Sequence, residues 1–132
     1  MIRRQLYIVR IGKMSDKYYK VKEDRYQRFV FTLQQCGKFL VDASDDTIET
    51  CIFEDFDIGI RSDICDENLD LFAYEGWISE EIKNKCLKLK SLFFNIYNKQ
   101  PQIWNIQSVR TSEIWREVLE LSDEIKSLLY IC

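Results

Sequence analysis

The side chains of this sequence best suited to chemistry are carboxylates, and they are concentrated between residues 41 and 81. In that segment, Asp55 and Asp57 followed by Gly59 partly match a calcium-binding EF-hand loop. An EF-hand needs Gly at its sixth position and a bidentate Glu at its twelfth. Counted from Asp55, Gly59 is fifth and Asp66 is twelfth, so the spacing does not fit. We therefore expect no metal site in this segment.

Other catalytic side chains are scarce. Histidine is absent, which removes the commonest general base, His-activated nucleophiles and imidazole-containing zinc sites. The closest two of the five cysteines are 14 residues apart, so there is no CxxC pair, and we expect reduced thiols. These observations predict a protein that is not an enzyme and has no metal or cofactor. A carboxylate enzyme stays open as an alternative, because no motif pairs the acids.

The charge is strongly polarised along the chain, although its formal total is only −3. Residues 1–40 carry +7, residues 41–81 carry −13 and residues 82–132 carry +3. The basic first segment could neutralise the acidic one, and an acidic face can simply be solvated. A basic partner protein is the functional alternative, because complementary charge speeds association and selects partners.

We predict that partner-binding residues lie in the acidic segment. Residues three and four apart on a helix are neighbours, so the acids from Asp63 to Asp70 are expected to share one face. Aromatic side chains at a helix end, ringed by charge, are typical interface anchors. The candidate partner-binding residues are Asp45, Asp46, Glu49, Glu54, Asp55, Asp57, Asp63, Asp66, Glu67, Asp70, Tyr74 and Trp77.

The elements that must position these residues are predicted to be mostly helices, because the chain has one proline and four glycines. Apolar residues at helical spacing predict a helix from Asp24 to Leu40 that continues through Gly37. Ser44 is expected to cap a short helix, and the alternation of polar and apolar residues over 54–60 predicts an extended segment or loop.

Further helices follow. Ser62 or Asp63 is expected to cap a helix that runs to Tyr74, with Gly76 ending it in a left-handed conformation, and Ser79 is expected to cap the next one. That helix is predicted to have one apolar face. Residues 100–107 are predicted to form a loop. Thr111 or Ser112 is expected to cap the last helix. The two expected apolar faces consist of Ile82, Cys86, Leu89, Phe93 and Ile96, and of Ile114, Val118, Leu121, Ile125 and Leu128.

The predicted fold is a single domain over residues 1–132, mainly α, a compact bundle of about four to five helices. Residues 1–22 are left undecided, with a short strand over Leu6–Ile11 and a partner at Tyr18–Val21 as one alternative.

No apolar run approaches the roughly 18 residues of a membrane span, and no leader sequence is apparent. We expect a cytoplasmic protein that contacts no membrane and no nucleic acid directly.

Three stretches from residue 57 onward resemble the immunity proteins of bacterial polymorphic toxin systems, in particular those of contact-dependent growth inhibition. They are DIGIR from Asp57, YEGWISEEI from Tyr74 and WREVLELSDEI from Trp115. The resemblance implies a non-catalytic cytoplasmic protein that binds the toxin domain of its own system, often a nuclease, and blocks its active site or nucleic-acid cleft. It carries over no functional residue.

Together, the residues and the resemblance predict an immunity protein whose acidic surface covers a basic, nuclease-type toxin domain. The alternative is a phage- or antitoxin-like acidic inhibitor of a host nucleic-acid-binding protein.

Overall fold

The computed structural model describes residues 13–131, and over these residues the fold is mainly α, as predicted, with no β-strand. The stretch Leu6–Ile11 lies outside the described residues, whereas Tyr18–Val21 is helical. The α-helices are α2 (Lys13–Gln34), α3 (Asp45–Ile48), α4 (Asp57–Ser62), α5 (Asp66–Tyr74), α6 (Glu80–Lys99), α7 (Ile106–Thr111) and α8 (Glu113–Leu128). A π-helix spans Glu49–Phe56, and 3-10 helices span Lys38–Asp42 and Pro101–Ile103.

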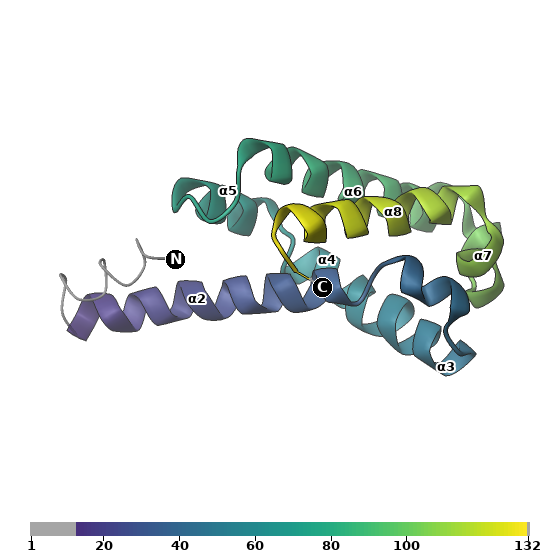
Figure 1. Ribbon diagram of the computed structural model, residues 1–132, viewed down its shortest axis with the longest axis horizontal. Helices are drawn as coiled ribbons and strands as arrows, with labels where there is room; N and C mark the ends of the chain where they lie inside the picture. The colour runs from purple at the N-terminus through teal and green to yellow at the C-terminus, as the bar shows by residue number, and fades with distance from the viewer. Residues whose placement is uncertain (1–12, 132) are drawn as a thin grey trace.

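The helices form an elongated bundle (Figure 1). α6 and α8 run antiparallel along one side, and α2 runs along the other. α5 lies at the end near the start of α2, while α3 and α7 lie at the opposite end. The apolar side chains buried between these elements form one core cluster, in which Phe29, Phe93 and Trp115 are fully buried.

The long helix α2 differs from its prediction at both ends. It begins at Lys13, ahead of the expected Asp24, and it ends at Gln34 rather than at Leu40. The prediction that the helix continues through Gly37 was therefore wrong, because Gly37 is extended and precedes a 3-10 helix. Within α2, the apolar residues Tyr26, Phe29 and Leu33 that predicted the helix are buried, and Val30 is half-buried.

α3, the π-helix and α4 follow one another without a break, so residues 45–62 form a continuous helix, which we call the 45–62 helix. Ser44 caps it as predicted, accepting a hydrogen bond from the Thr47 N–H. The extended segment expected over residues 54–60 was wrong. The alternation of polar and apolar residues suggested an extended segment or loop. In the structure, Ile58 is 65% exposed, and the residues that enter the core are four positions apart.

That period of four explains the π-helix. The fully buried residues of the 45–62 helix are Ile48, Ile52, Phe56 and Ile60. A step of four overshoots an α-helical turn of 3.6 residues, whereas a π-helix, with hydrogen bonds from residue i to i+5, has turns longer than four. Combining the two keeps all four side chains on one line. We call this line the core row.

α5 begins later than predicted, at Asp66 after Cys65, so neither Ser62 nor Asp63 caps it. Its end is as predicted. Gly76 has φ 76°, in the left-handed region, and the Trp77 N–H donates to the Phe72 carbonyl at 2.9 Å. This is a Schellman motif, which satisfies the last carbonyls of the helix.

The pair α6 and α8 matches its prediction closely. Ser79 and Ser112 are the N-caps, and the predicted face of α6 is buried in full. On α8, Val118, Leu121 and Ile125 are buried. Ile114 is half-buried and Leu128 is exposed. The connection between the two helices is more structured than the expected loop, because it contains α7.

Candidate functional site

The core residues of the 45–62 helix recur every four positions. Its other residues therefore also form rows of every fourth residue, which lie around the helix beside the core row. The row facing α6 and α7 we call the groove row: Asp45, Glu49, Phe53, Asp57 and Arg61. The row pointing outward we call the outer row: Asp46, Thr50, Glu54, Ile58 and Ser62. Contacts support the assignment, because Phe53 packs on Trp104 while Gly59, which lies in neither row, faces Thr32 of α2 on the opposite flank.

Most of the predicted partner-binding acids already have a cation within the protein. The cations come from α2, α4, α6 and α7, and each N–O distance is 3.5 Å or less. The pairs are Glu67 with Arg25, Asp63 with Arg28, Asp57 with Arg61, Asp70 with Lys83, Asp66 with Lys90 and Asp45 with Arg110. Arg25 and Arg28 come from the basic first segment, which was one interpretation of the charge pattern, whereas Arg61 lies in the acidic segment itself and the other three cations come from residues 82–132.

The expected four-acid face is incomplete. Asp66, Glu67 and Asp70 lie on α5, but Asp63 precedes that helix and turns toward α2. There it accepts a hydrogen bond from the Thr32 hydroxyl at 3.2 Å, and its side chain is only 16% exposed. Asp63 thus has a structural role that the spacing rule did not indicate.

Four predicted acids have neither an ion pair nor a side-chain hydrogen bond with the side chains that the structure describes, those of residues 19–131. They are Asp46, Glu49, Glu54 and Asp55, all on the 45–62 helix. The first three are exposed and Asp55 is half-buried. Asp46 and Glu54 belong to the outer row, and Glu49 belongs to the groove row. The unneutralised charge of the predicted partner-binding residues thus lies on this helix.

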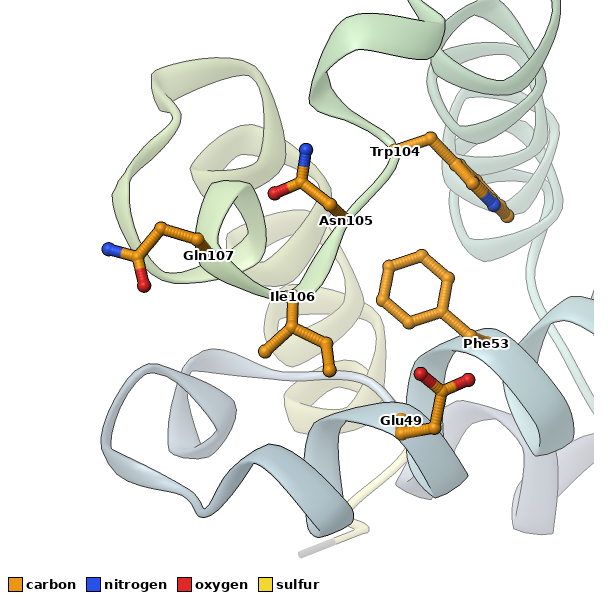
Figure 2. A pocket seen from close by; sticks show the side chains of 6 residues that line it. All are labelled: Glu49, Phe53, Trp104, Asn105, Ile106 and Gln107. Carbon is orange, nitrogen blue, oxygen red and sulfur yellow. The ribbon is translucent and has the colours of Figure 1, made fainter.

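Beside Glu49 the surface is hollowed into a groove of about 640 Å³ (Figure 2). One wall is the π-helix, with Glu49 and Phe53, and the other is the connection from α6 to α7. The lining residues are Glu49, Phe53, Trp104, Asn105, Ile106 and Gln107. The Glu49 carboxylate lies beside the ring of Phe53 at the groove.

The aromatic wall of the groove is held rigidly. The centroid of the Trp104 ring lies 5.1 Å from the ring centroid of Phe53, 5.1 Å from that of Tyr97 and 5.2 Å from that of Phe93. Each pair of rings is arranged edge to face. Behind it, the buried Trp115 donates its indole N–H to the Ile103 carbonyl at 2.7 Å, which fixes the connection. Such packing presents a preformed binding surface.

The two predicted aromatic anchors are placed very differently. Tyr74 is 86% exposed, so it is accessible to a partner. Trp77 is packed against Tyr19, Tyr26 and Phe72, with ring centroids 5.4 to 6.0 Å apart. It holds the turn between α5 and α6 to α2 and is not a free interface anchor.

Of the residues that line the groove, only Glu49 was singled out from the sequence. Trp104 and Ile106 fell within the predicted loop of residues 100–107, and Phe53 was not among the predicted partner-binding residues. A signal was present in the constant four-residue spacing of Asp45, Glu49 and Phe53, which places a carboxylate and a ring side by side.

None of the four described cysteines forms a disulfide, and Cys132 lies outside the described residues. Burial raises the pKa of the Cys36 and Cys86 thiols to about 12. Burial, and then the nearby Asp55 carboxylate, also raise the pKa of the Cys51 thiol. Since the thiolate is the reactive form, the buried Cys36 and Cys86 thiols are inert at neutral pH, and the Cys51 thiol is less reactive than an ordinary cysteine.

We expect iodoacetamide at pH 8 to leave Cys36 and Cys86 of the native protein unmodified. Cys65, which is half-buried, should be modified first, and modification of Cys51 should accelerate as the pH rises toward its raised pKa. Peptide mass spectrometry of time points measures this order. Modification of Cys36 at the rate of Cys65 would contradict the complete burial of the Cys36 thiol, and the urea-unfolded protein serves as the control.

Compared with known proteins, the chain matches no protein-family model, no curated protein and no solved structure. Over the described residues, no group of three or more Cys, Asp or Glu side chains is arranged to hold a metal ion. The same part of the chain contains no helix that combines the length and apolar character of a membrane span.

Proposed function

We propose that this protein is a helical binding protein that acts by docking its acidic surface on a basic protein partner. More specifically, it is an immunity protein that neutralises a cognate toxin domain of the nuclease type. The charge of the surface and the resemblance to such immunity proteins both support this assignment. The observation that carries the proposal is the set of unneutralised acids on the 45–62 helix beside a preformed groove.

The internal ion pairs narrow the docking surface. Asp66, Glu67 and Asp70 already contact cations, so a partner would have to compete for them. Asp46, Glu49 and Glu54 contact no cation among the described residues, and they would meet a basic partner without breaking an existing pair. We therefore place the centre of the interface on the 45–62 helix rather than on α5.

Docking there would block a nuclease by competition. A nuclease groove binds phosphates through Arg and Lys side chains, and carboxylates compete for the same groups. Together, the side chains of the groove row and the outer row form a surface along the whole 45–62 helix on which such a nuclease groove could dock. A catalytic role is less supported, because among the described lining residues the groove contains one carboxylate, that of Glu49.

The direct test is co-expression with the toxin domain encoded by the neighbouring gene. The protein is expected to protect the cells and to co-purify with the toxin. Absence of both would exclude the immunity function. If the protein instead captures a host nucleic-acid-binding protein, the alternative of an acidic inhibitor of such a protein would be established.

Reversal of one outward charge is expected to slow association. Glu54→Lys should lower the association rate constant with the toxin about three- to tenfold at low salt and weaken its salt dependence, because steering by charge contributes to the rate. Stopped-flow fluorescence at two salt concentrations measures both effects. Glu117→Lys on α8 changes the net charge equally at another exposed site, so equal slowing by the two variants would argue against this interface.

A further inference from the structure

The groove row shows a repeated arrangement in which a carboxylate holds a guanidinium. At one end, Asp45 accepts a hydrogen bond from Arg110 of α7 at 2.6 Å. At the other end, Asp57 Oδ1 accepts two hydrogen bonds from Arg61, from Nε at 3.2 Å and from Nη2 at 3.1 Å. Glu49 lies between these pairs and has no cation among the described residues.

The Arg61 site shows how this side of the molecule accommodates an arginine of the protein itself. Its guanidinium carbon lies 4.9 Å from the ring centroid of Phe94 and 4.9 Å from that of Tyr97. The guanidinium therefore combines a carboxylate with aromatic rings, which is the environment that favours arginine. Tyr97 in turn packs on Trp104, so the same aromatic array extends into the groove.

The groove repeats those components without a cation from the described part of the chain. Glu49 supplies the carboxylate, and Phe53 and Trp104 supply the rings. Its volume of about 640 Å³ falls within the roughly 300–1,000 Å³ usual for binding pockets. Arg110 is already occupied, because it donates to the Ala43 carbonyl at 2.9 Å as well as to Asp45. A partner molecule can supply the cation that would complete the arrangement.

We propose that the groove binds an arginine side chain of the partner protein, with its guanidinium between the Glu49 carboxylate and the rings of Phe53 and Trp104. This inference rests on the proposed function, because it names the partner group recognised at that surface. Arginine is favoured over lysine, since the planar guanidinium stacks on rings and donates two parallel hydrogen bonds to one carboxylate.

The test uses Nα-acetyl-arginine amide as the probe. Nα-acetyl-citrulline amide is its uncharged isostere, and Nα-acetyl-lysine amide, with a free side-chain ammonium, is the second cation. Each is titrated at constant ionic strength into the full-length, isotope-labelled protein and followed by NMR. The indole N–H of Trp104, identified with Trp104→Phe, and the backbone N–H of Phe53 report on the groove. We expect saturable shifts with arginine, weaker shifts with lysine and none with citrulline.

Glu49→Gln is expected to weaken binding of the arginine probe about fivefold, because it removes a partly exposed charge pair while keeping the side-chain shape. Glu117→Gln is the matched control and should leave binding unchanged. Equal shifts with arginine and citrulline, no shift with arginine, or equal binding by Glu49→Gln and the wild type would each overturn the proposal.

These outcomes are independent of the test of immunity. A wild-type protein that protects cells but whose groove ignores arginine would overturn this inference alone. A groove that binds arginine selectively in a protein that neither protects cells nor co-purifies with the toxin would overturn the immunity function alone.

Discussion

Replacement of Gly59 by alanine is expected to lower the free energy of unfolding by about 1–2 kcal/mol, because α4 and α2 touch at this residue. A Cβ atom on Gly59 would lie 2.8 Å from Cβ of Thr32 and closer still to its Oγ1 and Cγ2 atoms. Overpacking of this kind costs about 1–3 kcal/mol, occasionally more. The gain in helix propensity from glycine to alanine, about 1 kcal/mol, opposes it. Because the nearest atoms belong to a branched side chain on a rigid helix, we expect the clash to dominate.

The measurement is urea denaturation followed by circular dichroism. Ile58→Ala is the neighbouring control, since Ile58 is 65% exposed and a surface change should stay within about 0.5 kcal/mol. Thr32→Ala, made in the Gly59→Ala background, removes the two closest atoms and should recover part of the loss. A stabilised Gly59→Ala variant would show that α2 and α4 are further apart in solution than this contact requires.

This contact also matters for the groove. Gly59 lets the 45–62 helix approach α2, and the Thr32 hydroxyl that faces it donates to Asp63. The core row anchors the face of this helix that lies between the Gly59 flank and the groove row. The position of Glu49 and Phe53 relative to Trp104 therefore depends on a close contact on the opposite flank of their helix.

The sequence predicted α6 and α8 well because their signals are local and agree with each other. Each has a serine N-cap, and their apolar residues alternate in steps of three and four. Burial follows those steps directly, since an α-helix of 3.6 residues per turn brings such positions to one face. The mainly α fold follows from the same signals.

The 45–62 helix was only partly predictable, because its spacing is not that of an α-helix. A constant step of four from Ile48 to Ile60 differs from the α-helical alternation of three and four, and in a strand the same face would also carry Thr50 and Glu54. The π-helix that accommodates this spacing is uncommon. Local alternation around Ile58 therefore suggested an extended segment, although the core row already contained the helical signal.

The candidate site was less predictable than the fold, because its charges are paired over long sequence separations. Asp45 meets Arg110, and Asp66 meets Lys90, across intervening elements. A count of charge along the chain correctly located an acidic segment. It could not show which carboxylates remain without a cation, because that depends on how the helices pack.

The end of α2 depends on side chains of α8, which leads to the prediction with the largest expected effect. Lys126, only 5% exposed, donates to the Cys36 carbonyl at 2.7 Å and pairs with Asp123 at 3.2 Å. Ser122, fully buried, donates to the same carbonyl at 2.9 Å. The Cys36 carbonyl, just beyond the end of α2, is thus satisfied by donors from another helix.

Lys126→Met is therefore expected to lower the free energy of unfolding by about 2–3 kcal/mol. Breaking a buried ion pair costs about 3–5 kcal/mol, and the lower value applies because Asp123 is 40% exposed and also accepts from the Lys38 backbone N–H at 3.0 Å. Methionine keeps most of the side-chain volume, so the loss reports on the ammonium group. Lys88→Met, at an exposed position of α6, should change stability by less than about 0.5 kcal/mol.

Ser122→Ala separates the two donors to the Cys36 carbonyl. It should cost about 1 kcal/mol, the net contribution of one neutral hydrogen bond, because Lys126 still donates to that carbonyl. The double variant leaves the carbonyl buried with neither donor, so its loss should exceed the sum of the single losses. Additive losses in urea denaturation would mean that the carbonyl finds another donor, and that α2 ends at Gln34 for reasons other than its contact with α8.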